Sequence, residues 1–234
     1  MTLPLIISIE GNIGTGKSTI IENLKRHMGQ DTDAGIVFLK EPVDIWESIR
    51  DSESGETILQ KFYADPQKYA FSFQVMAYAS RLSMIRAQLN AEPRPQVVIC
   101  ERSLEADYNI FAKMLHDDGA IDDVNYQVYK LFYEEFSYNY AIDAVIYLDS
   151  DAEVCHRRIS KRARDGESGI PLDYLAKCKA YHDTWLSEVT IDKLHLNTNA
   201  DATYDGSDIG TEWLERIQQF IYTTKNMKSN AYVD

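Results

Sequence analysis

The residues of this chain with the most recognisable chemistry form a phosphate-binding loop near the N-terminus. The segment has the pattern G-x-x-x-x-G-K-S and reads Gly11-Asn12-Ile13-Gly14-Thr15-Gly16-Lys17-Ser18-Thr19. Its glycines let backbone N–H groups point at a phosphate, Lys17 can reach the terminal phosphates, and the Ser18 hydroxyl can bind Mg²⁺. Because an apolar segment precedes the loop and an amphipathic one follows it, we predict that it binds ATP or GTP. A glycine turn that fits the motif by chance is the alternative.

Three further charged residues follow apolar runs that we predict to be strands. Glu41 follows residues 36–39, and Glu101 and Arg102 follow residues 97–100. Ligands of open parallel sheets bind beyond the carboxyl ends of the strands, so these side chains are expected to face the phosphate loop. Phosphoryl transfer needs a position for the attacking hydroxyl, a carboxylate for Mg²⁺ and a cation on the developing charge. Glu41 could accept the proton of the hydroxyl, Glu101 could hold Mg²⁺, and Arg102 could contact the transferred group. Taken singly, Glu101 and Arg102 could equally form a rim salt bridge, and Glu41 could be a solvated turn carboxylate.

A basic segment occurs inside an otherwise acidic chain. Arg158 and Arg162 are four residues apart, so two like charges share one helix face at a cost that a bound anion would remove. Arg164 and Glu167 follow directly. We predict a mobile lid at about residues 158–169 that closes over the triphosphate, with a solvated basic face as the alternative.

A long apolar and aromatic segment, residues 69–90, carries two polar residues on one helical stripe. Gln74 and Arg81 are seven residues apart, and burying them without partners would be costly. A planar ligand with hydrogen-bonding edges would satisfy both. We predict that they contact a nucleobase, with Phe111 stacked on its face, while capping of another helix is the alternative.

These side chains must be positioned by alternating strands and helices. Five short apolar runs are predicted as strands, at residues 5–9, 36–39, 97–100, 144–148 and 194–196. Helices are predicted at residues 17–28, 45–50, 57–64, 69–90, 105–115, 125–138, 152–163, 172–191 and 211–224. Strands that are apolar throughout are typical of a parallel sheet buried on both faces. The sequence thus predicts an α/β fold with a five-stranded parallel sheet flanked by helices on both faces.

Composition narrows the possible class of protein. The 234 residues carry a formal charge of −13, which argues against a nucleic-acid partner, whose footprint would be basic. No apolar run approaches the roughly 20 residues of a membrane span, and the first strand begins too near Met1 for a targeting peptide. Three widely spaced cysteines fit neither a disulfide framework nor a zinc site, so we expect a cytoplasmic protein with no membrane partner. We predict one domain over residues 1–224 and a disordered polar tail at 225–234.

Several motifs of this chain occur in the order and at the spacing that one known protein family shows. They are the phosphate loop, Glu41-Pro42-Val43, Phe71-x-Phe73-Gln74, Glu101-Arg102-Ser103 with Asp107, and the run from Arg158 to Leu172. With these motifs the chain resembles the deoxyribonucleoside kinases of the deoxycytidine, deoxyguanosine and deoxyadenosine kinase type, over residues 5 to about 186. The resemblance implies a P-loop kinase fold, a homodimer, and transfer of the γ-phosphoryl group of ATP to the 5′-hydroxyl of a deoxynucleoside in nucleotide salvage.

The same resemblance implies roles for single residues. Glu41 would be the base for the 5′-hydroxyl, with Arg102 and Lys17 completing the catalytic set, and Ser18 and Glu101 would hold Mg²⁺. Residues implied at the nucleoside are Glu41, Trp46, Tyr63, Phe73, Gln74, Arg81, Arg102, Asp107, Phe111 and Glu167. Residues implied at ATP are those of the loop from Gly11 to Thr19 together with Arg158, Arg162 and Arg164.

The base preference can be predicted from the charged pair at the base. If Asp107 holds Arg81 against the base edge, Arg81 donates to an acceptor such as a purine N7 or O6 and crowds the position of the thymine methyl group. We therefore predict deoxyadenosine, deoxyguanosine or deoxycytidine ahead of thymidine. Two other functions stay open, a nucleoside monophosphate kinase such as a thymidylate kinase, and a non-catalytic relative with a nucleotide-binding or structural role.

Overall fold

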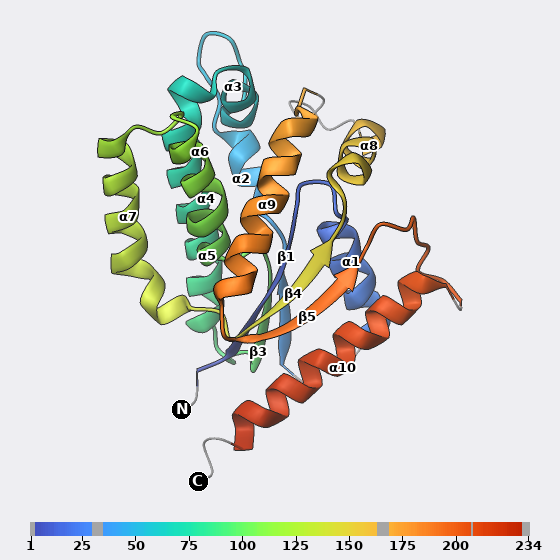
Figure 1. Cartoon of the computed structure of the whole chain (residues 1–234). Coiled ribbons are helices and arrows are strands. Elements are labelled where there is room, and N and C mark those ends of the chain that lie inside the picture. The colour runs from blue at the N-terminus through green and yellow to red at the C-terminus, as the bar shows by residue number, and fades with distance from the viewer. Residues whose placement is uncertain (1–2, 30–34, 163–168, 207, 231–234) are drawn as a thin grey trace.

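A five-stranded, all-parallel sheet forms the centre of the computed structural model, which describes residues 3–29, 35–162, 169–206 and 208–230 (Figure 1). Its strands are β1 (Leu5–Gly11), β2 (Ile36–Leu39), β3 (Val97–Glu101), β4 (Ala144–Asp149) and β5 (Asp192–Asn197). They lie in the order β2-β3-β1-β4-β5, so β1 is central. The predicted α/β class and all five predicted strands are confirmed. The carboxyl ends of β1, β2 and β3 therefore meet at one edge of the sheet, where the predicted site residues follow them.

Helices cover both faces of this sheet (Figure 1). Alternate residues of β1 point to opposite faces, so Ile7 and Ile9 pack on one side and Ile6 on the other. The first face is covered by α1 (Lys17–Met28) and α10 (Ile209–Asn230). The second is covered by α4 (Pro66–Leu89), α9 (Leu172–Glu188) and the short helices after β3, with α7 (Asp123–Ser137) outside α4.

The segment after β3 is not the single helix predicted at residues 105–115. It consists of α5 (Leu104–Ala106), the π-helical turn η2 (Asp107–Ala112) and α6 (Lys113–Asp117). Single π-helical turns inside α-helices occur often at functional sites. This one carries both Asp107 and Phe111, two of the predicted substrate contacts.

Two short helices, α2 (Val43–Ser48) and α3 (Ile58–Ala64), lead from β2 to α4. A capping box starts α3, because the side chain of Thr57 accepts from the backbone of Gln60 and the side chain of Gln60 accepts from that of Thr57. The next helix, α4, begins three residues earlier than predicted, with Pro66 in its first turn.

The C-terminal part of the chain differs from the sequence prediction. Residues 225–230 are not a disordered tail, because α10 continues to Asn230. The Lys228 ammonium lies 2.6 Å from one carboxylate oxygen of Asp143, and the other oxygen accepts from the backbone of Ile6 at 2.8 Å. This contact attaches the end of α10 to the start of β1. Residues 231–234 lie outside the described part of the chain.

Candidate active site

The phosphate loop connects the central strand β1 to α1. Lys17 is buried, and its ammonium donates to the carbonyl oxygens of Gly11 at 3.0 Å and Asn12 at 2.8 Å. Gly14 has a φ of +86°, and a side chain there would meet the backbone oxygen of Cys155 at 2.6 Å. Burial, followed by the charge of Arg102, lowers the pKa of Lys17 to about 8. The loop thus holds its lysine inward, where an anion would restore a higher pKa.

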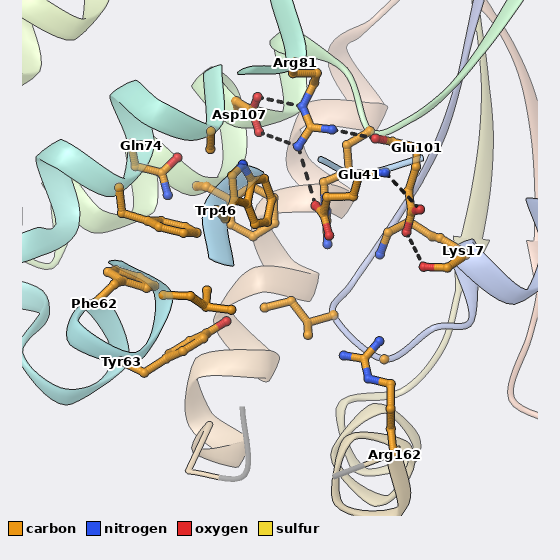
Figure 2. Close-up of a pocket in the computed structure, with 18 of the residues that line it drawn as sticks. Lys17, Glu41, Trp46, Phe62, Tyr63, Gln74, Arg81, Glu101, Asp107 and Arg162 are labelled. Atoms are coloured by element: carbon orange, nitrogen blue, oxygen red, sulfur yellow. Dashed lines mark hydrogen bonds and ion pairs between the residues drawn. The ribbon is translucent and has the colours of Figure 1, made fainter. Parts of the chain in front are cut away.

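The Glu41 carboxylate lies between the phosphate loop and an aromatic pocket (Figure 2). Arg102 Nε is 3.2 Å from Glu41 Oε1, and Arg102 Nη1 donates to the carbonyl of Gly11 at 3.0 Å. The Arg102 guanidinium also lies over the Phe111 ring, 4.5 Å from its centroid. One arginine therefore links the carboxylate that follows β2 to the phosphate loop that follows β1.

The Ser18 hydroxyl and the Glu101 carboxylate, two groups with oxygen atoms that can bind a metal ion, lie next to each other in the same cleft. The Ser18 hydroxyl donates to Glu101 Oε1 at 2.7 Å, and Glu101 Oε2 accepts from the backbone N–H of Glu41 at 3.3 Å. A carboxylate and a hydroxyl at this distance are the kind of ligands that Mg²⁺ takes from a protein when it binds together with a nucleotide. Ser18 and Glu101 therefore fit a magnesium site.

A buried ion pair lies at the far side of Glu41. Arg81 Nε donates to Asp107 Oδ2 at 2.8 Å, and both side chains are less than 5% exposed. Arg81 Nη1 also donates to the Glu101 carbonyl at 2.6 Å, and its Nη2 lies 3.5 Å from Glu41 Oε1. Burial lowers the pKa of Arg81, but the charges of Asp107 and Glu41 outweigh it, so Arg81 stays charged. Arg81 thus connects Asp107 to the Glu41 carboxylate and to the backbone carbonyl of Glu101.

Aromatic side chains form the rest of the pocket (Figure 2). The Trp46 and Phe73 rings meet edge to face with centroids 5.5 Å apart. Tyr63 comes from α3, and Gln74 is buried on α4 with an Oε1 atom that has no hydrogen-bond partner within the described ranges. A buried amide oxygen without a partner needs a donor, which a bound nucleobase can supply.

The sequence analysis missed five residues that line the cleft, among them Leu59, Phe62 and Tyr174. Phe62 stacks on Phe73 with centroids 4.6 Å apart and planes 6° apart, and Leu59 and Tyr174 also line the cleft. The helical spacing of Leu59 and Phe62 beside Tyr63 is a signal that could have found two of them. No comparable signal marks Tyr174.

The structure separates the two lid arginines that it describes. Arg162 lines the cleft near the phosphate loop (Figure 2). Arg158, on the same helix α8 (Ala152–Arg162), instead donates to the carbonyls of Thr198 at 2.9 Å and Ala200 at 2.7 Å, beyond β5. We expected Arg158 and Arg162 to line the triphosphate site together. In this conformation only Arg162 lines the cleft, because Arg158 donates to carbonyl oxygens about 40 residues further along the chain.

The other two predicted lid residues are not placed by the structure. Arg164 and Glu167 lie outside the described residues, as does half of the segment predicted to close. Their assignment to ATP and to the nucleoside stays a prediction.

Glu105, behind the site, is a half-buried residue whose carboxyl oxygen Oε2 is inaccessible to solvent. Its Oε1 accepts from the backbone of Ile142 at 3.0 Å, and its Oε2 has no hydrogen-bond partner among the described residues. Burial raises the pKa of Glu105 from 4.5 to about 7. The folded protein therefore binds more protons than the unfolded chain between these pH values, and the free energy of unfolding falls as pH rises through this window.

The variant Glu105→Gln tests that pH dependence. We expect it to raise the free energy of unfolding at pH 8 by up to about 3 kcal/mol, because the unfavourable buried charge is removed. Near pH 4.5 the wild-type group is already neutral in the folded state, so little gain is expected. Urea unfolding at both pH values measures the difference, and an equal effect at the two would contradict the assignment.

Comparison with known proteins identifies a family. The model of the family described as "Deoxynucleoside kinase" matches residues 7–221. A Fowlpox virus protein named "Probable deoxycytidine kinase" is 34% identical, with 92% of this chain and 87% of that protein covered. Rat deoxycytidine kinase is 31% identical, with coverage of 93% and 91%.

A relative whose name gives a different substrate has a similar sequence identity to this chain. The mitochondrial deoxyguanosine kinase of Xenopus laevis is 31% identical, with 92% of this chain and 89% of that protein covered. The family match at residues 7–221 spans both the phosphate loop and the aromatic pocket described above. The chain belongs to the deoxynucleoside kinase family.

Proposed function

We propose that this ATP-dependent deoxynucleoside kinase uses Glu41 as the general base in phosphorylating the 5′-hydroxyl of its substrate. The observation that carries the proposal is the position of the Glu41 carboxylate, which lies between the phosphate loop and the aromatic pocket and is paired with Arg102 at 3.2 Å. A neutral alcohol needs a base to become a good nucleophile, whereas an ionised phosphate acceptor does not.

The transfer step balances as an in-line displacement. Glu41 accepts the proton of the 5′-hydroxyl as the oxygen forms a bond to the γ-phosphorus, and the bond to the bridging oxygen breaks with its electron pair leaving on ADP. Lys17 and the loop N–H groups hold the phosphates, and Arg102 and Arg162 lie where they can stabilise charge on the transferred group. Ser18 and Glu101 would hold Mg²⁺, which neutralises phosphate charge when bound.

The aromatic pocket supports the proposed nucleoside site. Trp46, Phe73 and Phe111 offer apolar walls for a planar base, and Gln74 offers both an acceptor and donors to its edge. Tyr63 supplies a hydroxyl at the same pocket for the sugar.

We propose that deoxyadenosine, deoxyguanosine and deoxycytidine are preferred over thymidine. Arg81 is held by Asp107 and lines the pocket. A base bound there would meet its guanidinium, which can donate to a base acceptor and would take the space that the thymine methyl group needs. The names of the relatives, deoxycytidine kinase and deoxyguanosine kinase, agree with this preference.

Initial rates test both the reaction and the preference. ATP and Mg²⁺ would be supplied with each of the four deoxynucleosides and, separately, with each of the four deoxynucleoside monophosphates. The proposal expects products only from the nucleosides, with thymidine the poorest. Activity on monophosphates alone would assign a monophosphate kinase, and no turnover with ATP still binding would assign a non-catalytic relative.

We also propose that the protein is a homodimer. The helix α7, at the left edge of Figure 1, carries a stripe of exposed apolar residues. Its residues are Val124, Val128, Leu131, Phe132 and Phe136. Contiguous exposed apolar residues on one helix face are typical of an interface, and a second copy of the chain would bury the same stripe by two-fold symmetry.

Leu131→Lys tests the dimer. Leu131 is 66% exposed, so the variant should fold, but a charge in the centre of the stripe should convert the protein to a monomer. Gln127→Lys adds the same charge on the polar side of α7 and should leave the dimer intact. Sedimentation at matched concentration measures both, and a dimer that survives Leu131→Lys would place the interface elsewhere.

We further propose a cytoplasmic location. Cys100, Cys155 and Cys178 are all buried and free, as suits a reducing compartment. Across the helices that the structure describes, none combines the length and the apolarity that crossing a membrane requires. Since one relative is named as mitochondrial, fractionation of cells expressing the tagged chain is the direct test.

A further inference from the structure

A buried serine behind the wall of the aromatic pocket takes no part in the mechanism above. Ser80 lies in the interior of α4, is 7% exposed, and is not among the described residues that line the cleft. Alanine forms helices more readily than serine, so a buried helical position gains nothing from serine through the helix itself. The hydroxyl group of Ser80 therefore calls for a partner outside α4.

That partner is Trp46, which belongs to α2. Trp46 Nε1 donates to Ser80 Oγ at 3.0 Å, and Ser80 Oγ donates to the carbonyl of Ala77 at 3.0 Å. The bond to Ala77 occupies the hydroxyl proton, so the lone pairs of the oxygen remain to accept from the indole. The one polar atom of the Trp46 side chain, which is 5% exposed, is thus satisfied by Ser80.

The Trp46 ring forms part of the wall of the cleft (Figure 2). Its edge-to-face contact with Phe73, with planes 72° apart, belongs to a class of contact that tolerates a range of ring geometries, whereas a hydrogen bond is directional. The helix α2 has six residues and no side-chain cap at its start, so tertiary contacts must hold it. The bond from Trp46 to Ser80 therefore both sets the plane of the ring and attaches α2 to α4.

We propose that Ser80 is a positioning residue that orients Trp46 as a wall for the base of the deoxynucleoside. This inference rests on the proposed nucleoside site in the aromatic pocket. Ala77, which accepts from Ser80, lines that pocket together with Gln74 and Arg81 of the same helix. Ser80 thus connects the wall that comes from α2 to the helix that carries the groups proposed to contact the base edge.

The kinetic consequence follows from where the bond acts. Ser80 shapes the space for the base, which is bound in the same way before and during phosphoryl transfer. An interaction that is equal in the ground state and the transition state affects KM and leaves kcat unchanged. A residue needed only for the general stability of the fold would show no such selectivity.

Ser80→Ala tests the proposal. The variant leaves the indole N–H buried without a partner, and we expect KM for the deoxynucleoside to rise about tenfold. We expect kcat and KM for ATP to change by less than about twofold. Ser80→Thr keeps the hydroxyl group and should hold KM within about twofold of the wild type.

Ser72→Ala is the matched control. Ser72 is also in α4, and its hydroxyl donates to the carbonyl of Tyr69 at 3.1 Å, three residues earlier, as Ser80 does to Ala77. Ser72 is exposed, however, and should behave as wild type when it is replaced.

A double-mutant cycle separates positioning from general damage to the fold. Trp46→Phe keeps an aromatic ring and lacks the N–H, so in this background Ser80→Ala should cause no further rise in KM. An equal rise in both backgrounds, or an unchanged KM for Ser80→Ala alone, would overturn the inference. If Ser80→Ala does not fold, Ser80→Cys is used. Its sulfur is a weaker acceptor, with about a threefold rise in KM expected and an unchanged KM decisive against the proposal.

Failure of the proposed function would give a different pattern. A wild-type protein that phosphorylates no deoxynucleoside would remove the nucleoside site on which this inference depends. Wild-type kinase activity beside a Ser80→Ala variant that loses kcat with KM unchanged, or that loses nothing, would remove only the inference about Ser80.

Discussion

Replacing Glu41 by glutamine should lower kcat by at least about 100-fold while ATP binding is retained. Glutamine has the size of glutamate and can still accept a hydrogen bond from Arg102, which lies 3.2 Å from Glu41 Oε1. It cannot take a proton from the substrate hydroxyl. The phosphate loop, including Lys17 and its bonds to Gly11 and Asn12, does not depend on the Glu41 side chain.

Single-turnover rates and calorimetric titration with a non-hydrolysable ATP analogue measure the two halves of this prediction. Glu47→Gln, the same change at an exposed position of α2, is the matched control and should behave as wild type. Unchanged turnover in Glu41→Gln would exclude the carboxylate as the base. A loss of ATP binding as large as the loss of kcat would instead assign it a role in organising the nucleotide site.

The parts of this site that follow strands could be predicted from the sequence. Parallel strands carry their carboxyl ends to one edge, so Glu41, Glu101 and Arg102 had to gather near the phosphate loop once the apolar runs were recognised as strands. The structure brings them together through the Ser18–Glu101 and Arg102–Glu41 contacts. Local pattern and topology were sufficient here because each residue lies within two positions of a strand end.

Features set by contacts between distant segments could not be predicted in this way. Arg158 turns to the carbonyls beyond β5, which lie about 40 residues away in the chain, so no helical spacing could reveal its orientation. The π-helical turn at Asp107 interrupts a segment whose apolar period favours a continuous α-helix. The extension of α10 depends on Lys228 meeting Asp143. For Arg158 and for α10, tertiary contact outweighs the local pattern.

Removing the buried ion pair at the base should change the substrate preference. We expect the double variant Arg81→Leu/Asp107→Ala to raise the ratio of kcat/KM for thymidine to that for deoxycytidine by roughly 10- to 100-fold. The guanidinium that we propose to donate to base acceptors and to occupy the space of the thymine methyl group would be gone. Since Arg81 also contacts Glu101 and Glu41, kcat should fall for every substrate, and the ratio is therefore the informative quantity.

Both partners must be replaced together for this test. Arg81→Leu alone would leave Asp107, only 3% exposed, as an uncompensated buried carboxylate and should destabilise the protein by about 3–5 kcal/mol. Removing the exposed pair Lys113 and Asp117 by double alanine substitution is the control and should leave the ratio unchanged. A double variant that folds, shows its usual thermal stability and still rejects thymidine would mean that the aromatic walls, rather than Arg81, exclude the methyl group.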